Sequence, residues 1–457
     1  MGNAESSAYQ RRTARVPPEE QAQIQRGFDN LTRNPSKKYL GLAAFQDSVG
    51  DSLPAAMSRR FFNGMQSVNL TGKMAPAASG AEVTRDQFVV FIIDLLKGTA
   101  EEKSAIVTPM IAADNSEQIT GPQVQQFLED MIGAAVHVLR QQNALSGWTL
   151  ENTRDCDTGV RAVAAQLVSQ MKADGLPSPD APESSHFSRA AIEDWLYKAP
   201  IVSALLRVVV TLGFSVLRQN VEQQRDVASL VPRCRGGRAP AFTSLLDLPA
   251  VMFLNFHLPS DMQHKWRLLF STRLHGESFS QLCGHLVDQG PSLLVVRDAG
   301  GFIFGGFASH NWEVKPRFQG DSTCFLFTVS PRLEVFTYTG YNDHYMYLNH
   351  GQQTMPNGLG MGGQHDFFGL WIDSNFGKGH SKAKPRCTTY NSPQLSASEE
   401  FTIDAMEVWG LGDLTEELQV KNKKSILDAD PEVQALMEMT GRTRQSEGLR
   451  DKDDDET

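Results

Sequence analysis

Apolar residues recur at helical spacing through the first part of the chain. Pro17 and the acidic residues that follow it are typical of a helix start, and Ile24, Phe28 and Leu31 then fall on one face. Similar periodic segments follow, separated by turns and without a strand pattern, at 42–49, 57–68, 86–96, 105–112 and 123–139. The pattern therefore predicts a domain of short helices over residues 16–142.

Beyond residue 142 the pattern changes. Residues 143–190 predict a helix and a flexible linker, because their end is rich in Gly, Pro and Ser. Residues 191–242 read as a helical segment that leads into the next domain, and their apolar stretch contains Arg207. A central arginine is unfavourable in hydrocarbon, so we expect a buried helix here and not a membrane span. Short apolar runs divided by Gly, Asp or Pro then predict strands in residues 243–412.

Glycine and aromatic motifs occur in a fixed order within this strand-rich region. They include WRLLFS from Trp266, GGFAS from Gly305, GLGMGG from Gly358, FFGLWID from Phe367 and MEVWG from Met406. Together these motifs resemble the TLDc domain. The resemblance implies a β-sandwich with flanking helices over residues 243–412, and thus an α+β chain whose amino-terminal helices are EF-hand-like.

The chain as a whole resembles the myristoylated TLDc proteins of the lysosome that take part in mTOR signalling. This resemblance implies a non-enzymatic adaptor at the cytosolic face of the lysosomal membrane and in the cytoplasm. Its expected partners are the V1 subunits of the V-ATPase, mTOR signalling components and the membrane itself. The alternative is a cytosolic oxidation-resistance protein with thiol chemistry, for which Cys387 is the candidate. The formal charge of -10 argues against a nucleic-acid partner.

The first residues match an acylation pattern. MGNAES fits M-G-x-x-x-[ST], so we expect a myristoyl group on Gly2 and a flexible arm over residues 1–15. One myristoyl chain anchors only marginally, and a second attraction is needed. Arg11, Arg12 and Arg15 could supply it against anionic lipid headgroups, and a partner at the membrane could do so equally.

Neither of two EF-hand alignments predicts calcium binding. An EF-hand loop needs oxygen ligands at alternate positions and a glutamate at the twelfth. With Leu40 as the central apolar residue, the first and twelfth positions are Arg33 and Ala44. With Ile119 in that place, the twelfth position is Gln123. We therefore expect no metal in this domain.

Three other patterns superficially suggest chemistry. The glycines of 358–363 lack the spacing of a nucleotide-binding loop and read as tight turns between strands. Cys283 and His285 lie on an apolar helical pattern, which favours a buried structural cysteine. Four histidines in a Gly-rich region lack metal-ligand spacing and read as loop hydrogen-bonding groups: His344, His350, His365 and His380. We expect no catalytic residues and no cofactor.

Residues 413–457 form an extension with an amphipathic helix and an acidic tail. Asp430 and Pro431 are typical of a helix start. Four residues then share one face: Val433, Leu436, Met437 and Thr440. So short a helix is marginal alone, so its face either folds back on the sandwich or binds a groove of a partner. We favour the partner, which by resemblance is the V-ATPase.

Overall fold

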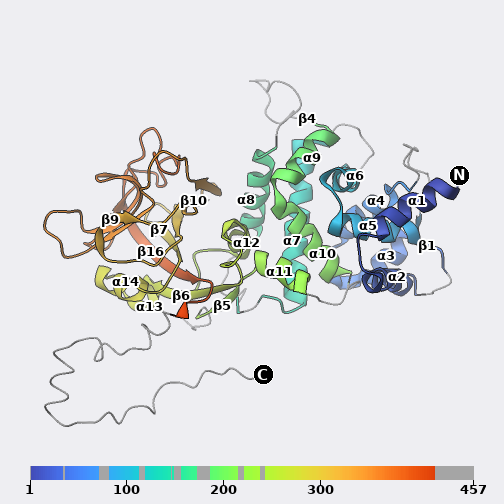
Figure 1. Cartoon of the computed structure of the whole chain (residues 1–457), viewed down its shortest axis with the longest axis horizontal. Coiled ribbons are helices and arrows are strands. Elements are labelled where there is room, and N and C mark those ends of the chain that lie inside the picture. The colour runs from blue at the N-terminus through green and yellow to red at the C-terminus, as the bar shows by residue number, and fades with distance from the viewer. Residues whose placement is uncertain are drawn as a thin grey trace, which may run out of the picture.

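The computed structural model describes residues 2–33, 37–70, 82–112, 119–145, 147–148, 156–171, 186–214, 221–236 and 242–416. It is an α+β molecule, as expected: helices occupy the amino-terminal part and a large, mostly antiparallel sheet occupies the rest. Figure 1 shows the helices and the sheet side by side, with α1 (Gly2–Thr13) at the end farthest from the sheet.

The first helices form a pair of EF-hand-like units. Each unit is a helix, a loop ending in a short strand, and a second helix. The first unit has α2 (Pro18–Thr32), β1 (Tyr39–Gly41) and α3 (Leu42–Val49), and the second has α4 (Ala55–Gln66), β2 (Glu82–Thr84) and α5 (Arg85–Lys97). Strands β1 and β2 pair antiparallel, with Leu40 opposite Val83. This strand pair ties the two units together.

A second pair of the same kind follows. Its first unit has α6 (Ala100–Ile111), β3 (Ile119–Thr120) and α7 (Gly121–Gln141), and its second has α8 (Cys156–Ser169), β4 (His186–Phe187) and α9 (Arg189–Lys198). Ile119 lies opposite Phe187 in the antiparallel β3–β4 pair. The structure thus divides the chain differently from the sequence, because boundaries at 142 and 190 cut through this pair. The pairing joins residues far apart in the chain, which local periodicity does not reveal.

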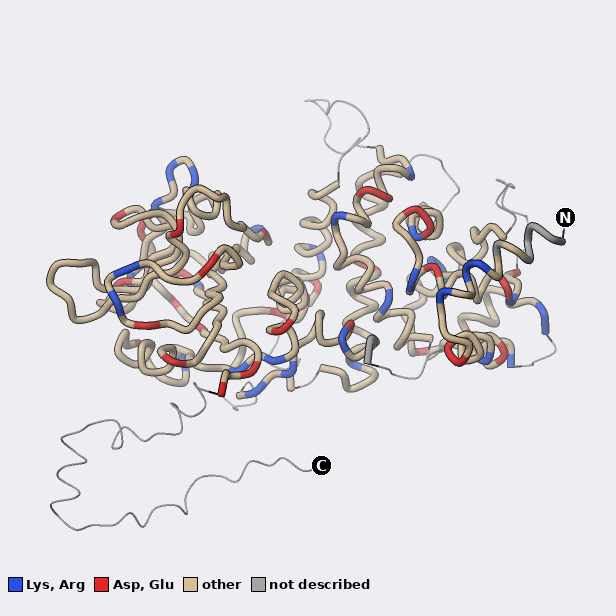
Figure 2. The backbone as a smooth tube through the Cα atoms, in the orientation of Figure 1, with Lys and Arg blue, Asp and Glu red and all other residues tan. Residues whose placement is uncertain are grey.

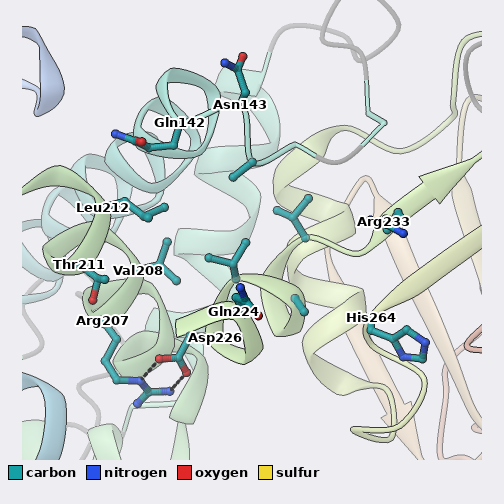
Figure 3. A pocket seen from close by; sticks show the side chains of 14 residues that line it. Gln142, Asn143, Arg207, Val208, Thr211, Leu212, Gln224, Asp226, Arg233 and His264 are labelled. Carbon is teal, nitrogen blue, oxygen red and sulfur yellow. Dashed lines mark hydrogen bonds and ion pairs between the residues drawn. The ribbon is translucent and has the colours of Figure 1, made fainter. Parts of the chain in front are cut away.

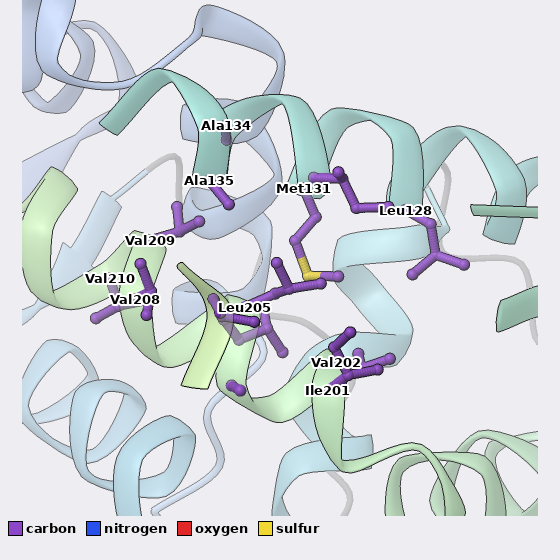
Figure 4. Close-up of a cluster of buried hydrophobic side chains, with 14 of the residues drawn as sticks. Leu128, Met131, Ala134, Ala135, Ile201, Val202, Leu205, Val208, Val209 and Val210 are labelled. Carbon is purple, nitrogen blue, oxygen red and sulfur yellow. The ribbon is translucent and has the colours of Figure 1, made fainter. Parts of the chain in front are cut away.

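Helix α10 (Pro200–Gly213) forms the core that both pairs share. It packs against α7 and α5, and its apolar side chains are buried. Figure 4 shows Leu205 facing Met131 of α7, and Val209 facing Ala135 of the same helix. The predicted buried helix at this place is confirmed. No single helix among the described residues has the length and apolar character of a membrane span; α9 and α10 reach it only together, and they meet at 90°.

The sheet folds into two half-sheets that share one long strand, β16 (Glu400–Leu411). The first half-sheet adds β5 (Arg233–Arg235), β6 (Lys265–Ser271), β7 (Ser292–Asp298), β8 (Ile303–Ala308), β10 (Phe325–Ser330) and β11 (Glu334–Thr337). The second adds β9 (Lys315–Gln319), β12 (Met346–Asn349), β13 (Gly358–Gln364), β14 (Phe367–Asp373) and β15 (Lys378–His380). Residues 400–402 of β16 pair with β15, and residues 403–411 pair with β7 and β6.

The two half-sheets pack face to face around an apolar core. Leu294 and Leu326 from the first half-sheet and Met361 and Leu370 from the second belong to one buried cluster. Gly306 allows close approach, since a Cβ there would lie 2.5 Å from the Met361 sulfur. Helices α13 (Thr272–His275) and α14 (Phe279–Leu286) flank this core. The expected sandwich with flanking helices is therefore present.

The outer face of the first half-sheet packs on the helices. Helix α12 (Leu248–His257) lies between them and contacts α8 and α11 (Val221–Leu230). Trp148, which follows α7, packs its ring 5.8 Å from that of Trp266 on β6 and 5.2 Å from that of Trp409 on β16. The indole of Trp148 donates to the Pro232 carbonyl oxygen at 2.9 Å. Helices and sandwich thus share one continuous buried core.

Substitution of Gly305 on β8 tests whether the packing requires a residue without a side chain beside β7. An added Cβ would overlap the carbonyl oxygen of Leu294 and lie 2.7 Å from the Phe327 ring. We expect Gly305→Ala to lower the free energy of unfolding of the chain by roughly 2–3 kcal/mol, because a backbone atom cannot move aside without separating two strands. The measurement is urea unfolding followed by tryptophan fluorescence.

The matched control is Gly284→Ala on α14, where an added Cβ would have open space within 4 Å. Because alanine favours helix, this change should leave stability equal or raise it by up to about 1 kcal/mol. Equal stability of the two variants would contradict the packing that we describe for β7 and β8.

Candidate interaction surfaces

Gly2, the predicted lipidation site, is the first residue of α1. Residues 2–13 form this helix, whereas the sequence predicted a flexible arm. The helix is mostly polar, and its attachment lies near its end: Tyr9 packs on the helical core, and Thr13 and Val16 are buried. The pattern of apolar residues does not predict this helix, because ion pairs with other helices stabilise it.

Two arginines of this region bind carboxylates of the helices beneath. Arg12 Nη1 lies 3.3 Å from Asp94 Oδ2 on α5, and Arg15 donates to both carboxylate oxygens of Glu102 on α6, at 2.5 and 2.8 Å. We call these four residues the α1 clamp. The expectation that Arg12 and Arg15 face lipid does not fit this arrangement; Arg11 remains exposed.

Burial and charge act oppositely on the two acids of the α1 clamp. Burial raises the pKa of Asp94 to about 6, although Arg12 lowers it, and the Asp94 side chain is 2% exposed. The hydrogen bond from Arg15 lowers the pKa of Glu102 to about 2. Glu102 also accepts the Thr99 amide at 2.9 Å in a capping box, which fixes its position. The Arg15–Glu102 contact is thus the firmer half of the α1 clamp.

Three of the four candidate histidines lie on the outer face of the second half-sheet. The ring of His344 stacks on Phe318 of β9, with centroids 4.0 Å apart, and His365 lies 5.5 Å from the same ring. His380 stacks on Trp371, whereas His350 lies against Phe279. His344 Nδ1 also contacts the Gly363 carbonyl oxygen at 2.5 Å. Ring packing, more than loop hydrogen bonding, therefore explains this group.

These histidines are arranged for packing and not for metal binding. Burial lowers the pKa of His380 to about 4, so this ring is neutral at physiological pH. In the part of the chain that the structure describes, no group of three or more His, Cys, Asp or Glu side chains could hold a metal ion. The rings instead complete an aromatic cluster around Tyr347, Phe368 and Trp371.

The glycines of 358–363 lie in strand β13 and not in turns, so the interpretation from sequence was wrong. Gly358 and Gly360 lie under the rings of Trp371 and Phe368; a Cβ on Gly360 would be 2.6 Å from the Phe368 ring. Gly362 and Gly363, near the end of β13, have φ of 71° and 84°, a backbone conformation that favours glycine. The motif lets flat aromatic rings cover a strand.

The candidate thiols are poorly suited to nucleophilic chemistry. Burial raises the pKa of Cys283 to about 11, and burial also raises the pKa of Cys387. The His285 ring lies against His275, with centroids 4.2 Å apart. A reactive thiol needs a lowered pKa and access to solvent. Neither cysteine has a lowered pKa, and Cys387 is also buried. These observations give no support to the antioxidant alternative.

The EF-hand-like units lack the acid that closes a calcium site. The strand pairs fix the central residues as Leu40, Val83, Ile119 and Phe187. Four positions further on, where the bidentate glutamate belongs, the chain has Ala44, Gln87, Gln123 and Ala191. Gln87 and Gln123 instead accept the amides of Thr84 and Thr120 at 2.9 and 2.8 Å. In these two units, a capping box therefore occupies the position of the closing calcium ligand.

Two cavities lie near the junction of helices and sandwich. One, of about 460 Å³, lies between α7, α10 and α11, and the bidentate pair of Arg207 and Asp226 lies at its edge, as Figure 3 shows. The other, of about 430 Å³, lies between α8, α12 and the β10–β11 turn, and Asp247 and Arg297 are among its lining residues. Arg207, Asp226, Asp247 and Arg297 are already engaged with protein atoms.

The predicted partner-binding residues Val433, Leu436, Met437 and Thr440 lie outside the described residues, which end at 416. The chain leaves the sandwich beside β6. There Asp413 accepts hydrogen bonds from Lys265 at 2.8 Å and from His264 at 2.9 Å.

Sequence reasoning missed a buried acid at the junction. Glu407 on β16 is 2% exposed and accepts the Leu245 amide at 2.6 Å, the Ser244 hydroxyl at 3.0 Å and the Trp409 indole at 3.2 Å. Burial outweighs these donors and raises its pKa to about 7. A lone glutamate in the apolar run MEVWGL was the available signal.

The fold and its motifs define the class of protein. The family model described as the TLDc domain matches residues 240–412, which include every strand of the sandwich from β6 to β16. The chain belongs to the TLDc-domain proteins.

Comparison over the full length is more specific. The chain is 57% identical to MTOR-associated protein MEAK7 of Xenopus laevis over 99% of this chain and 98% of that protein. It is 55% identical to the Gallus gallus protein of that name over 100% and 99% of the two chains. It is 49% identical to the Homo sapiens protein over 100% of both. Within the TLDc-domain proteins, the chain therefore belongs to the MEAK7 family.

Glu407 predicts a pH dependence of stability. Its pKa in the folded chain, about 7, lies above the value of about 4.5 in an unfolded chain, so folding favours the protonated acid. The stability that it contributes is complete below pH 4.5 and is lost as the pH rises through 7. In the unchanged chain, this group lowers the free energy of unfolding by on the order of 3 kcal/mol between pH 5 and pH 8. We expect Glu407→Gln to remove this decrease, as measured by urea unfolding at a series of pH values.

The control is Glu400→Gln on the same strand, where the side chain is 81% exposed. This variant should keep the pH dependence of the unchanged chain. If Glu407→Gln also keeps it, Glu407 is not the titrating group.

Proposed function

We propose that this protein is a non-enzymatic adaptor that joins the lysosomal membrane to the V1 sector of the V-ATPase and supports mTOR signalling. The observation that carries the proposal is similarity over nearly the whole chain to proteins named for association with MTOR. Because the likeness includes the helices as well as the sandwich, it supports a shared mode of action for the entire chain and not for the TLDc domain alone.

The shape of the molecule supports a linking role. Gly2 begins α1 at one end, and the sandwich lies at the other end of the long axis (Figure 1). A lipid on Gly2 would attach the helical end to a membrane and leave the sandwich free to bind a protein partner. In Figure 2, Lys and Arg positions are interspersed with Asp and Glu positions over both the helices and the sandwich.

The chemistry of the sandwich also favours binding over catalysis. Its histidines pack against aromatic rings, and burial raises the pKa of Cys283 and Cys387. The proposed contact with the V-ATPase combines the sandwich with the apolar face of residues 433–440. That face follows the sandwich after the Asp413 contacts at β6.

Gly2→Ala tests the membrane contact. Without the amino-terminal glycine no myristoyl group is transferred, so we expect most of the chain to move from the lysosomal fraction to the soluble fraction. Mass spectrometry of the amino terminus and fractionation of cells measure the two steps. Ser7→Ala, just outside the required pattern, is the control and should stay with lysosomes. An unmodified Gly2 in the unchanged protein would contradict this part of the proposal.

A triple change, Val433→Asp, Leu436→Asp and Met437→Asp, tests the contact with the pump. Each buried apolar side chain contributes roughly 1.5–3 kcal/mol, so we expect at least a tenfold loss of V1 subunits that co-purify with the full chain. The control changes the opposite face, with Gln434→Ser and Glu438→Gln, and should bind as the unchanged chain does. Equal recovery of V1 subunits with both variants would refute this contact.

A further inference from the structure

We infer that α1 is a releasable element whose docking on α5 and α6 withholds two arginines from an anionic lipid surface. The α1 clamp holds the helix in the docked position. Undocking would present Arg11, Arg12 and Arg15 together, next to the acylated end. This inference rests on the proposed attachment through Gly2 and specifies how that attachment is regulated.

The geometry gives the docked helix little membrane affinity. Arg15 is in a bidentate pair with Glu102, and Arg12 is directed to Asp94 in a site where that carboxylate is 2% exposed. Of the three arginines, Arg11 is the exposed one. A single myristoyl chain needs a second attraction for stable anchoring, and each basic residue near an anionic surface adds about 1 kcal/mol. Docking therefore withholds most of that second attraction.

The two main ion pairs of the α1 clamp differ in strength, and the weaker one, between Arg12 and Asp94, favours release. Arg12 meets Asp94 through Nη1 alone, and neither Arg12 Nε nor Asp94 Oδ1 has a hydrogen bond within the described structure. Asp94 Oδ1 has a longer, weaker ion pair with Arg15 Nη1, at 3.9 Å. Buried polar atoms without hydrogen bonds oppose the docked state, because water would satisfy them after release. Burial likewise raises the pKa of Asp94 to about 6, which weakens its attraction for Arg12 in the protonated form.

The remaining attachment of α1 is small. Arg12 Nη1 also donates a long hydrogen bond to the Asn69 carbonyl oxygen at 3.5 Å. Tyr9 packs on the helical core as a partly buried side chain, and Thr13 is buried with its hydroxyl donating to the Tyr9 and Gln10 carbonyl oxygens within the same helix. Val16 is buried beyond the end of α1 and keeps the following chain in place. Arg15 lies between the end of α1 and Val16, so α1 and Arg15 can be released together while Val16 keeps the start of α2 in place.

The test neutralises the acids of the clamp and leaves the arginines. Full-length, N-myristoylated protein carrying Asp94→Asn and Glu102→Gln is sedimented with vesicles of phosphatidylcholine alone or with about 30% phosphatidylserine. We expect binding to the phosphatidylserine vesicles to rise by about tenfold over the unchanged chain, because two arginines become available. Binding to phosphatidylcholine alone should stay the same. Hydrogen exchange should become faster in residues 2–13 and stay slow in α5.

Two further variants make the result specific. Asp130→Asn with Asp194→Asn removes the same charge from ion pairs with Arg60 and Lys198, away from α1, and should not increase binding. Adding Arg12→Gln and Arg15→Gln to the clamp variant should abolish the gain. Equal binding of the clamp variant and the Asp130/Asp194 variant, or unchanged exchange in α1, would overturn the inference.

These outcomes are separate from failure of the proposed attachment. If Gly2→Ala leaves lysosomal localisation intact, the attachment proposal fails whatever the vesicles show. If Gly2→Ala abolishes localisation but the clamp variant gains no affinity for phosphatidylserine, attachment through Gly2 stands and release of α1 does not.

Discussion

The structure depends on the buried contact between the tryptophans of the helical part and of the sandwich. Trp148, Trp266 and Trp409 lie within 6.0 Å of one another, measured between ring centroids, and each indole nitrogen has a hydrogen-bond acceptor. Indoles bury large apolar areas and still satisfy a polar atom, which suits a junction that is dry yet specific. One acceptor is Glu407, which also holds the segment leading into α12. The sandwich is thereby fixed to the helices and not merely tethered.

In the helical part, packing and capping replace the ion that organises a calcium-binding EF-hand. The paired strands keep Leu40 opposite Val83 and Ile119 opposite Phe187. The glutamines at two of the closing positions fold back onto their own helix starts, which satisfies amides that would otherwise lack partners. The buried helix α10 then supplies apolar contacts to both pairs. The units are therefore held together by a fixed core, and their arrangement does not depend on the closing carboxylate.

Much of the fold could be predicted from the sequence because it is encoded locally. The strand pattern and the ordered motifs gave the sandwich, and apolar density at α10 gave a buried helix despite Arg207, which pairs with Asp226. What failed depends on partners distant in the chain. Asp94 lies 82 residues from Arg12, and β4 lies 67 residues from β3, so no local pattern links them. The glycines of β13 were misread because their role comes from rings on the neighbouring strand.

The parts of the structure also differ in whether apolar packing or ion pairs hold them, and this decides which contacts can respond to solution conditions. The junction and the two EF-hand-like pairs are held by buried apolar side chains, whose release would expose large areas to water. Helix α1 has few such contacts and is held chiefly by charges, whose strength changes with salt, with protonation and with competing anions. The proposed attachment through Gly2 would therefore lie beside the contact that responds most to solution conditions. Behind α1, the helices and the sandwich share one buried core, so the charges of the α1 clamp act at the edge of a body held together by apolar packing.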